Sequence, residues 1–172
     1  ASEILAVAMK EVGYDVVGKT TFGKGTVQQA VPLTEDQTGS TIKLTFYKWL
    51  SPEGNWINEV GVEPTVEQAQ PDFFYGSPIV IDEPLRVDDR DEQVENAQVL
   101  LEGIGYKPIR TDGHFDAEMK KIVEKFQSEQ KIEVTGEIDQ KTAQAIEFEV
   151  MEQIRSGKYD LQEQKALEVL YK

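Results

Sequence analysis

Residues Thr20–Gln29 have the sequence Thr-Thr-Phe-Gly-Lys-Gly-Thr-Val-Gln-Gln, in which Lys24 stands between two glycines near the start of the chain. Glycine permits positive φ and leaves no Cβ beside the lysine stem. A turn of this kind can shield an ammonium group from water, and desolvation lowers the pKa of such a group in general. A lysine with a lowered pKa can serve as a general base. The stretch therefore makes Lys24 a candidate catalytic base, with Gln28 four residues later in a run that predicts a strand.

The same stretch allows two other interpretations. Gly18–Lys24 fits the first seven positions of a phosphate-binding P-loop, but Gly25 stands where the magnesium-binding Ser or Thr is required. The residues that follow, Thr26–Leu33, are β-branched and extended, whereas a P-loop must open a helix. This disfavours a nucleotide site. Taken alone, the stretch also suits a surface hairpin with an exposed lysine.

The first residues of the chain add a second motif. Ala1–Ile4 reads Ala-Ser-Glu-Ile, and Thr21–Gln28 matches the pattern Thr-Phe-Gly-Lys-Gly-x-Val-Gln in full. Together they resemble the C-terminal processing peptidases, serine peptidases of the tail-specific protease family, and residues 42–64 match a third family segment in outline. The resemblance covers about residues 1–66. It implies that Lys24 is the general base, that Gln28 orients it, and that the substrates are proteins or peptides cleaved near their C-termini.

The nucleophile motif of that family is Ser-Ala-Ser-Ala-Ser-Glu-Ile. Its reactive serine is the one directly before Ala-Ser-Glu-Ile, so the resemblance places it ahead of Ala1. Ser2 matches the next serine of the motif, and it becomes the nucleophile if the alignment shifts by two positions. Without the serine hydroxyl no acyl-enzyme can form. We therefore expect residues 1–172 by themselves to be inactive.

Composition restricts the chemistry further. The chain of 172 residues has no cysteine and a single histidine, His114, so thiolate zinc sites, multi-histidine metal sites and histidine-based triads are all excluded. We expect no cofactor and no metal. The net charge of −14 argues against nucleic acid and anionic lipid as partners. No apolar run approaches 18 residues, so we expect no membrane segment in this chain.

The pattern of the first 92 residues predicts an α/β arrangement. Helical spacing is followed by short β-rich runs and polar turns. We expect a helix over 3–12, strands over 15–18, 27–33 and 41–49, and a polar turn at 34–40. Residues 1–66 are then the C-terminal part of a peptidase core. Residues 67–92, rich in proline and charge, are predicted as a linker whose Phe73–Tyr75 cluster pins it to a neighbouring domain.

Residues 93–148 change to helical periodicity. Phe126-Gln127 and Thr135-Gly136-x-Ile138-Asp139 are the most specific elements of a resemblance to the peptidoglycan-binding domain, a small three-helix module. The segment departs from that family at Asp116 and Met119, has no tryptophan and is acidic, so we expect peptidoglycan binding to be weak. The side chains predicted to form its core are Val94, Leu101, Ile122, Phe126, Ile138 and Ile146.

Residues 149–172 continue with helical spacing, broken at Ser156-Gly157. This tail is predicted to pack on the module or to mediate self-association, which makes a homo-oligomer a candidate assembly. The predicted fold is thus a partial α/β peptidase core, an all-α three-helix domain and a helical tail. The resemblance implies an endopeptidase with a Ser-Lys-Gln catalytic arrangement, located outside the cytoplasm. Any membrane anchor of the longer protein is expected upstream of residue 1. The alternative is a non-enzymatic cell-wall binding or assembly module built on 93–148, which would have no use for the Lys24 motif.

Overall fold

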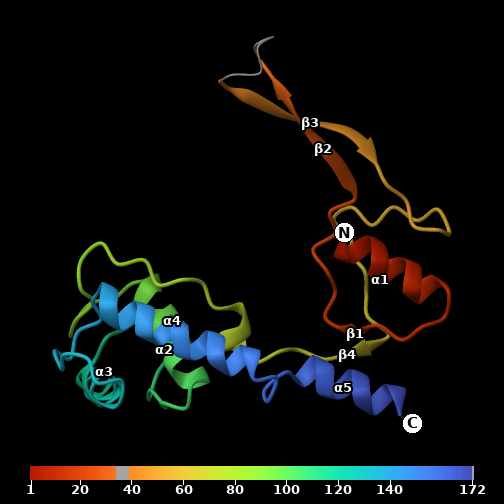
Figure 1. Cartoon of the computed structure of the whole chain (residues 1–172). Helices are drawn as coiled ribbons and strands as arrows, with labels where there is room; N and C mark the ends of the chain where they lie inside the picture. Colours follow the sequence, from red (N-terminus) through yellow and green to blue (C-terminus); the bar gives the residue numbers. More distant parts are fainter. Residues whose placement is uncertain (34–38, 172) are drawn as a thin grey trace. The chain divides into compact units, whose positions relative to one another are not determined.

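The computed structural model describes residues 1–33 and 39–171, which form two compact units. One unit contains residues 1–69 and 162–172, and the other contains Gln70–Leu161. The first holds short strands and two helices, at the start and the end of the chain, and the second is helical (Figure 1). The mixed α/β composition is as predicted. Most of the polar turn predicted at 34–40 lies outside the described residues.

The first unit is built on helix α1, Ser2–Glu11, which carries Glu3 in its first turn and Lys10 in its last. These charges suit the two ends of the helix dipole. Strand β1, Val17–Gly18, pairs in parallel with β4, Val66–Glu67. The buried core is small and consists of Val7, Ile57 and Val62, with Ala6 and Trp49 partly buried against it.

A long hairpin completes this unit. Strands β2, Thr26–Pro32, and β3, Thr41–Lys48, pair antiparallel and extend away from α1 (Figure 1). The pairing shifts register between Val27 and Gln28. Such a bulge bends a strand and changes where its side chains point. Here it lies immediately after the Lys24 turn.

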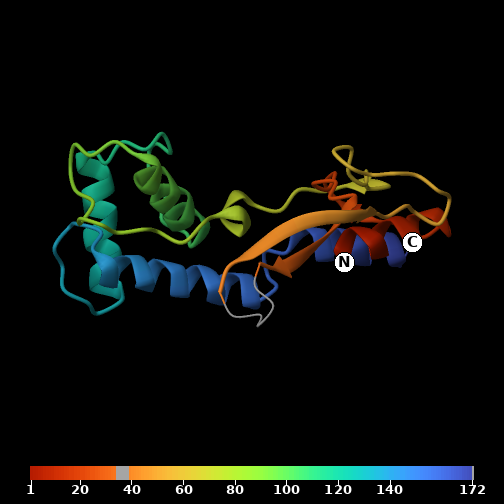
Figure 2. The same cartoon turned by 90° about the horizontal axis from the view of Figure 1, so that it is seen from above.

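The second unit contains the 3₁₀ helix η1, Asp72–Tyr75, and helices α2, α3 and α4. Their bounds are Glu92–Gly103, Ala117–Glu129 and Gln140–Arg155. Each begins with an aspartate, Asp91, Asp116 or Asp139, whose carboxylate accepts a backbone N–H of the first turn. Helix α3 is seen nearly end-on in Figure 1 and lengthwise in Figure 2, whereas α4 lies lengthwise in both, so these two helices cross steeply.

The core of the helical unit is larger than that of the first unit. Of the six side chains predicted to form it, five are fully buried and Ile122 is partly buried against the others. The buried side chains are Phe73, Ile79, Leu85, Val94, Ala97, Leu100, Leu101, Phe115, Met119, Val123, Phe126, Ile138, Ala143, Ile146 and Val150. Three of them come from the segment predicted as a linker.

That segment is fastened to the helices through its backbone. Asn96 of α2 bonds both the N–H and the carbonyl of Ser77, and Glu147 of α4 accepts the N–H of Ile79 at 2.7 Å. Leu85 exchanges two backbone hydrogen bonds of 2.9 Å with Ile138. Residues from Gln70 onward therefore fold as part of the helical unit.

After α4 the chain breaks at Ser156–Gly157, as predicted, and continues as α5, Leu161–Leu170. Gln162 at its start donates to the carbonyl of Gln68 at 2.9 Å. Of the helices in the described part of the chain, none combines the length and apolar character that crossing a membrane requires.

Candidate active site

Lys24 sits in a tight turn that leads into β2. Gly23 has a φ of 82°, and a Cβ on it would lie 2.6 Å from the backbone nitrogen of Gly61. A Cβ on Gly25 would lie 2.7 Å from the backbone nitrogen of Asn58. Both distances are shorter than real carbon contacts allow, so the two positions need glycine because the 57–61 turn packs against them. The glycines predicted to free the lysine stem also permit this packing.

Glu3 ties the start of α1 to the same turn. Its carboxylate accepts hydrogen bonds from the Thr21 hydroxyl, from Gly23 N at 2.6 Å and from Lys24 N at 3.0 Å. These bonds, the one from Thr21 foremost, hold the pKa of Glu3 below its usual value, although partial burial opposes them. The sequence reasoning did not assign Glu3 a role. The sequence does contain a signal for such a role, because Glu3 belongs to the Ala-Ser-Glu-Ile segment of the nucleophile motif.

Lys24 and Gln28 line one pocket of about 360 Å³ beside the start of α1. Ala1 lines it too, and Ser2 does not. The remaining lining residues are Glu3, Ile4, Thr26, Val27, Lys43 and Trp49. The structure therefore brings the two predicted site residues together with the first residue of the chain. Lys43, a second lysine in the pocket, was not predicted.

The two predicted side chains do not bond each other. The Gln28 amide donates to the Thr45 hydroxyl at 3.3 Å, across the hairpin. Among the residues that the structure describes, no side-chain hydrogen bond or ion pair holds the Lys24 ammonium group. Lys24 is exposed, so the turn does not shield its side chain from water as expected, and its amine is open to a group in the pocket that Ala1 also lines.

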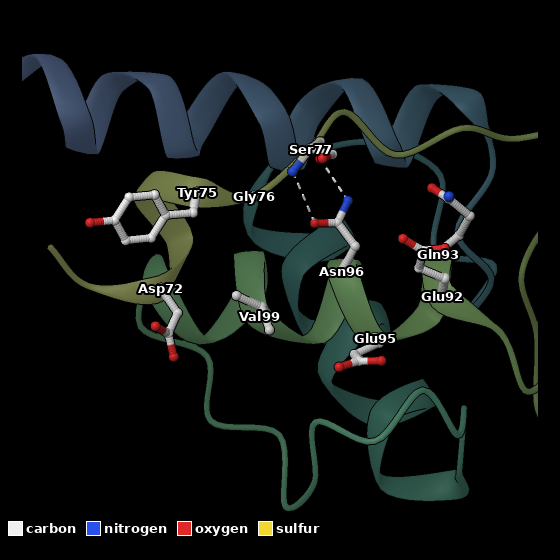
Figure 3. Close-up of a pocket in the computed structure, with 9 residues that line it drawn as sticks. All are labelled: Asp72, Tyr75, Gly76, Ser77, Glu92, Gln93, Glu95, Asn96 and Val99. Atoms are coloured by element: carbon white, nitrogen blue, oxygen red, sulfur yellow. Dashed lines mark hydrogen bonds between the residues drawn. The ribbon is translucent and has the colours of Figure 1, made fainter. Parts of the chain in front are cut away.

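A second pocket, of about 400 Å³, lies in the helical unit between η1 and α2. It is lined by Asp72, Tyr75, Gly76, Ser77, Glu92, Gln93, Glu95, Asn96 and Val99 (Figure 3). Asn96 is held by its two bonds to Ser77, and no lysine, histidine or cysteine reaches the pocket. It holds none of the motif residues, whereas the Lys24 pocket holds both Lys24 and Gln28 and is therefore the candidate active site. In the described residues no group of three or more His, Cys, Asp or Glu side chains could hold a metal ion.

Comparison with known families agrees with this location. Residues 1–68 match the family model of peptidase family S41, and residues 90–146 match that of a putative peptidoglycan binding domain. Residues 1–68 are thus similar to peptidase family S41. The candidate base, its neighbour Gln28 and the Glu3 contacts all lie inside the matched range.

Curated relatives match nearly the whole chain. The carboxy-terminal processing protease CtpB of Bacillus subtilis is 52% identical over 172 residues, which cover 99% of this chain and 35% of the relative. CtpA of the same organism is 35% identical over 173 residues, covering 100% of this chain and 36% of the relative. A probable CtpA-like serine protease of Staphylococcus haemolyticus is 35% identical over 143 residues, or 83% of this chain and 28% of the relative. The chain thus spans about a third of the length of these relatives.

Proposed function

We propose that this chain is the C-terminal part of a serine endopeptidase that cleaves protein substrates near their C-termini, with Lys24 as general base. The observation that carries the proposal is the shared pocket of Lys24, Gln28 and Ala1 at the start of α1. A serine directly before Ala1 would stand next to that pocket, whereas Ser2 does not line it. The substrate class follows from the relatives, which are named as carboxy-terminal processing proteases.

In this mechanism the neutral Lys24 amine takes the proton of the serine hydroxyl as the oxygen attacks the scissile carbonyl. The resulting ammonium then gives the proton to the departing amine of the substrate, which leaves an acyl-enzyme. Water, deprotonated by the same amine, then attacks the acyl carbonyl; the ester bond breaks, the acyl group leaves as a carboxylic acid, and the ammonium returns its proton to the serine oxygen. For Gln28 to orient the lysine, as the family resemblance implies, its amide must exchange its bond to Thr45 for one to Lys24. The mechanism requires the serine that the motif places directly before Ala1.

The helical unit supports a location outside the cytoplasm, because it matches a putative peptidoglycan binding domain. We propose protein substrates as the main partners of the longer protein, with peptidoglycan binding weak or absent. Self-association through the tail stays a prediction; Leu167 and Leu170 of α5 are exposed and available for it.

The direct test replaces Lys24 in the longer peptidase that contains this chain. Lys24→Ala should abolish cleavage of a substrate with an unstructured C-terminal tail, because it removes the proposed general base. Lys19→Ala is the matched control, since it removes a lysine five residues away that does not line the pocket. Cleavage by the Lys24→Ala protein at the wild-type rate would contradict the assignment.

A further inference from the structure

The backbone carbonyls at the Lys24 turn are held by two indole rings. Trp49 Nε1 donates to the carbonyl of Lys24 at 2.8 Å, and Trp56 Nε1 donates to the carbonyl of Gly25 at 2.9 Å. The chain has two tryptophans in all, and both make this contact. Tryptophan has one donor at the edge of a large ring, and that donor normally finds a partner when the ring packs.

The amide groups of the same two residues are also taken by side chains distant in sequence. Lys24 N donates to Glu3, and Gly25 N donates to Asn58 at 3.2 Å. Side chains from α1 and from the 57–61 turn thus accept the two N–H groups, while the two tryptophan side chains donate to the two carbonyls. We call Trp49 and Trp56 the indole clasp.

The indole clasp connects the turn to the rest of the first unit. Trp49 packs against the small core of Val7, Ile57 and Val62. The Lys48 ammonium lies over the Trp56 ring, 5.4 Å from the ring centroid. The Trp56 ring also packs against Gly25, since a Cβ on that glycine would lie 2.7 Å from Trp56 Nε1. Each ring has two side-chain torsions, so it holds its donor in place with little conformational freedom to lose.

A general base must lie within hydrogen-bond reach of its nucleophile, and a misplacement of about 1 Å can cost about 100-fold in rate. We propose that Trp49 and Trp56 are positioning residues: their N–H groups fix the Lys24 peptide so that the lysine side chain enters the pocket beside Ala1. This inference rests on the proposed role of Lys24 and extends it to two residues that exchange no proton, of which Trp49 also lines the pocket.

The first experiment needs no activity and uses the 172-residue chain. Two indole N–H signals are expected in a nitrogen–proton spectrum, assigned by Trp49→Phe and Trp56→Phe. Both protons should exchange slowly with deuterium, and each substitution should shift the backbone amide signals of Lys24 and Gly25. Tyr47→Phe is the control: it alters an exposed aromatic ring on β3 and should leave the Lys24 and Gly25 signals in place. Fast exchange of both indole protons, with unshifted Lys24 and Gly25 signals, would overturn the proposal.

The second experiment uses the longer peptidase. Trp49→Phe and Trp56→Phe should each lower kcat by about tenfold, the effect of one lost hydrogen bond, and change KM by less than about twofold. Replacing either tryptophan by 3-benzothienylalanine, which keeps the ring shape and loses the N–H, should reproduce the loss. 5-Fluorotryptophan, which keeps the N–H, should restore the rate. These isosteres decide the question even where phenylalanine impairs folding.

The outcomes separate the two claims. An active Lys24→Ala protein would refute the proposed function itself. An inactive Lys24→Ala protein together with a benzothienyl variant of unchanged kcat would leave the function standing and refute the indole clasp. A benzothienyl variant with lowered kcat, rescued by fluorotryptophan, would support both.

Discussion

A single carboxylate, that of Glu3, bonds one hydroxyl and two backbone N–H groups of the Lys24 turn. Sequence alone could identify Lys24 and Gln28, because the spacing of glycine, lysine and glutamine is specific. It could not show Glu3 or the indole clasp acting on the same turn, because these residues come from three separate places in the chain. Such contacts depend on how α1, the turn and residues 49–58 fold onto each other.

The Glu3 contacts predict a pH-dependent stability. The pKa of Glu3 is lower in the folded protein than its usual value of 4.5, so its contribution to stability is fully present above pH 4.5. That contribution is lost as the pH falls through the folded pKa. Glu3→Gln should therefore lower the melting temperature of the first unit at pH 7, and the difference from wild type should shrink in acid.

Thermal melts of the two proteins between pH 7 and pH 3 check this, with Glu67→Gln on β4 as the control. A Glu3→Gln protein that melts like wild type at pH 7 would show that the carboxylate contributes nothing to the turn.

Two phenylalanines on neighbouring helices of the helical unit differ in burial and so provide a matched test of its core. Phe126 of α3 is fully buried, with Tyr106 packed edge-on at 5.5 Å between ring centroids, whereas Phe148 of α4 is 61% exposed. Phe126→Ala should lower the free energy of unfolding by about 3–5 kcal/mol, since it removes a buried ring and leaves a cavity. Phe148→Ala should change it by less than about 0.5 kcal/mol. Urea denaturation of both variants measures the difference, and equal effects would contradict the assigned core.

The segment before α2 shows where sequence periodicity stops being informative. Residues 72–85 have no helical or strand repeat and contain prolines, so a linker was the natural prediction. The structure nevertheless buries Phe73, Ile79 and Leu85 in the helical core, because the side chains of α2 and α4 bond the backbone of this aperiodic segment. We propose that the folding unit is Gln70–Leu161, larger than the expected domain at 93–148.

Two neighbouring residues test that proposal. Ile79 is 3% exposed and Val80 is 60% exposed. Ile79→Ala should destabilise the helical unit by about 2–5 kcal/mol, and Val80→Ala by less than about 0.5 kcal/mol. A 90–148 fragment should melt below a 70–161 fragment in circular dichroism. Equal melting temperatures would show that the earlier segment is dispensable.

For the whole molecule, sequence motifs located both family segments. They could not show how stable each segment is or what it binds. The two units differ in how well they bury apolar side chains. The first has a small core and exposes Leu5 of α1 and Phe46 of β3, while the second has a continuous core. The relatives are about three times as long as this chain. We expect the first unit to gain further packing in a longer peptidase and the second to be self-sufficient.

The last prediction concerns the cell wall. The pocket between η1 and α2 presents the carboxylates of Asp72, Glu92 and Glu95 beside one exposed ring, Tyr75 (Figure 3). The net charge of the chain is −14. Carboxylates on peptide stems and anionic wall polymers would be repelled, so sedimentation of the 172-residue chain with purified peptidoglycan should show no saturable binding at physiological salt.

If charge repulsion is the cause, the double variant Glu92→Gln with Glu95→Gln should increase the sedimented fraction, most clearly at low salt. Saturable binding of the wild-type chain that persists at high salt would instead show that the helical unit anchors the protein to the wall through uncharged contacts.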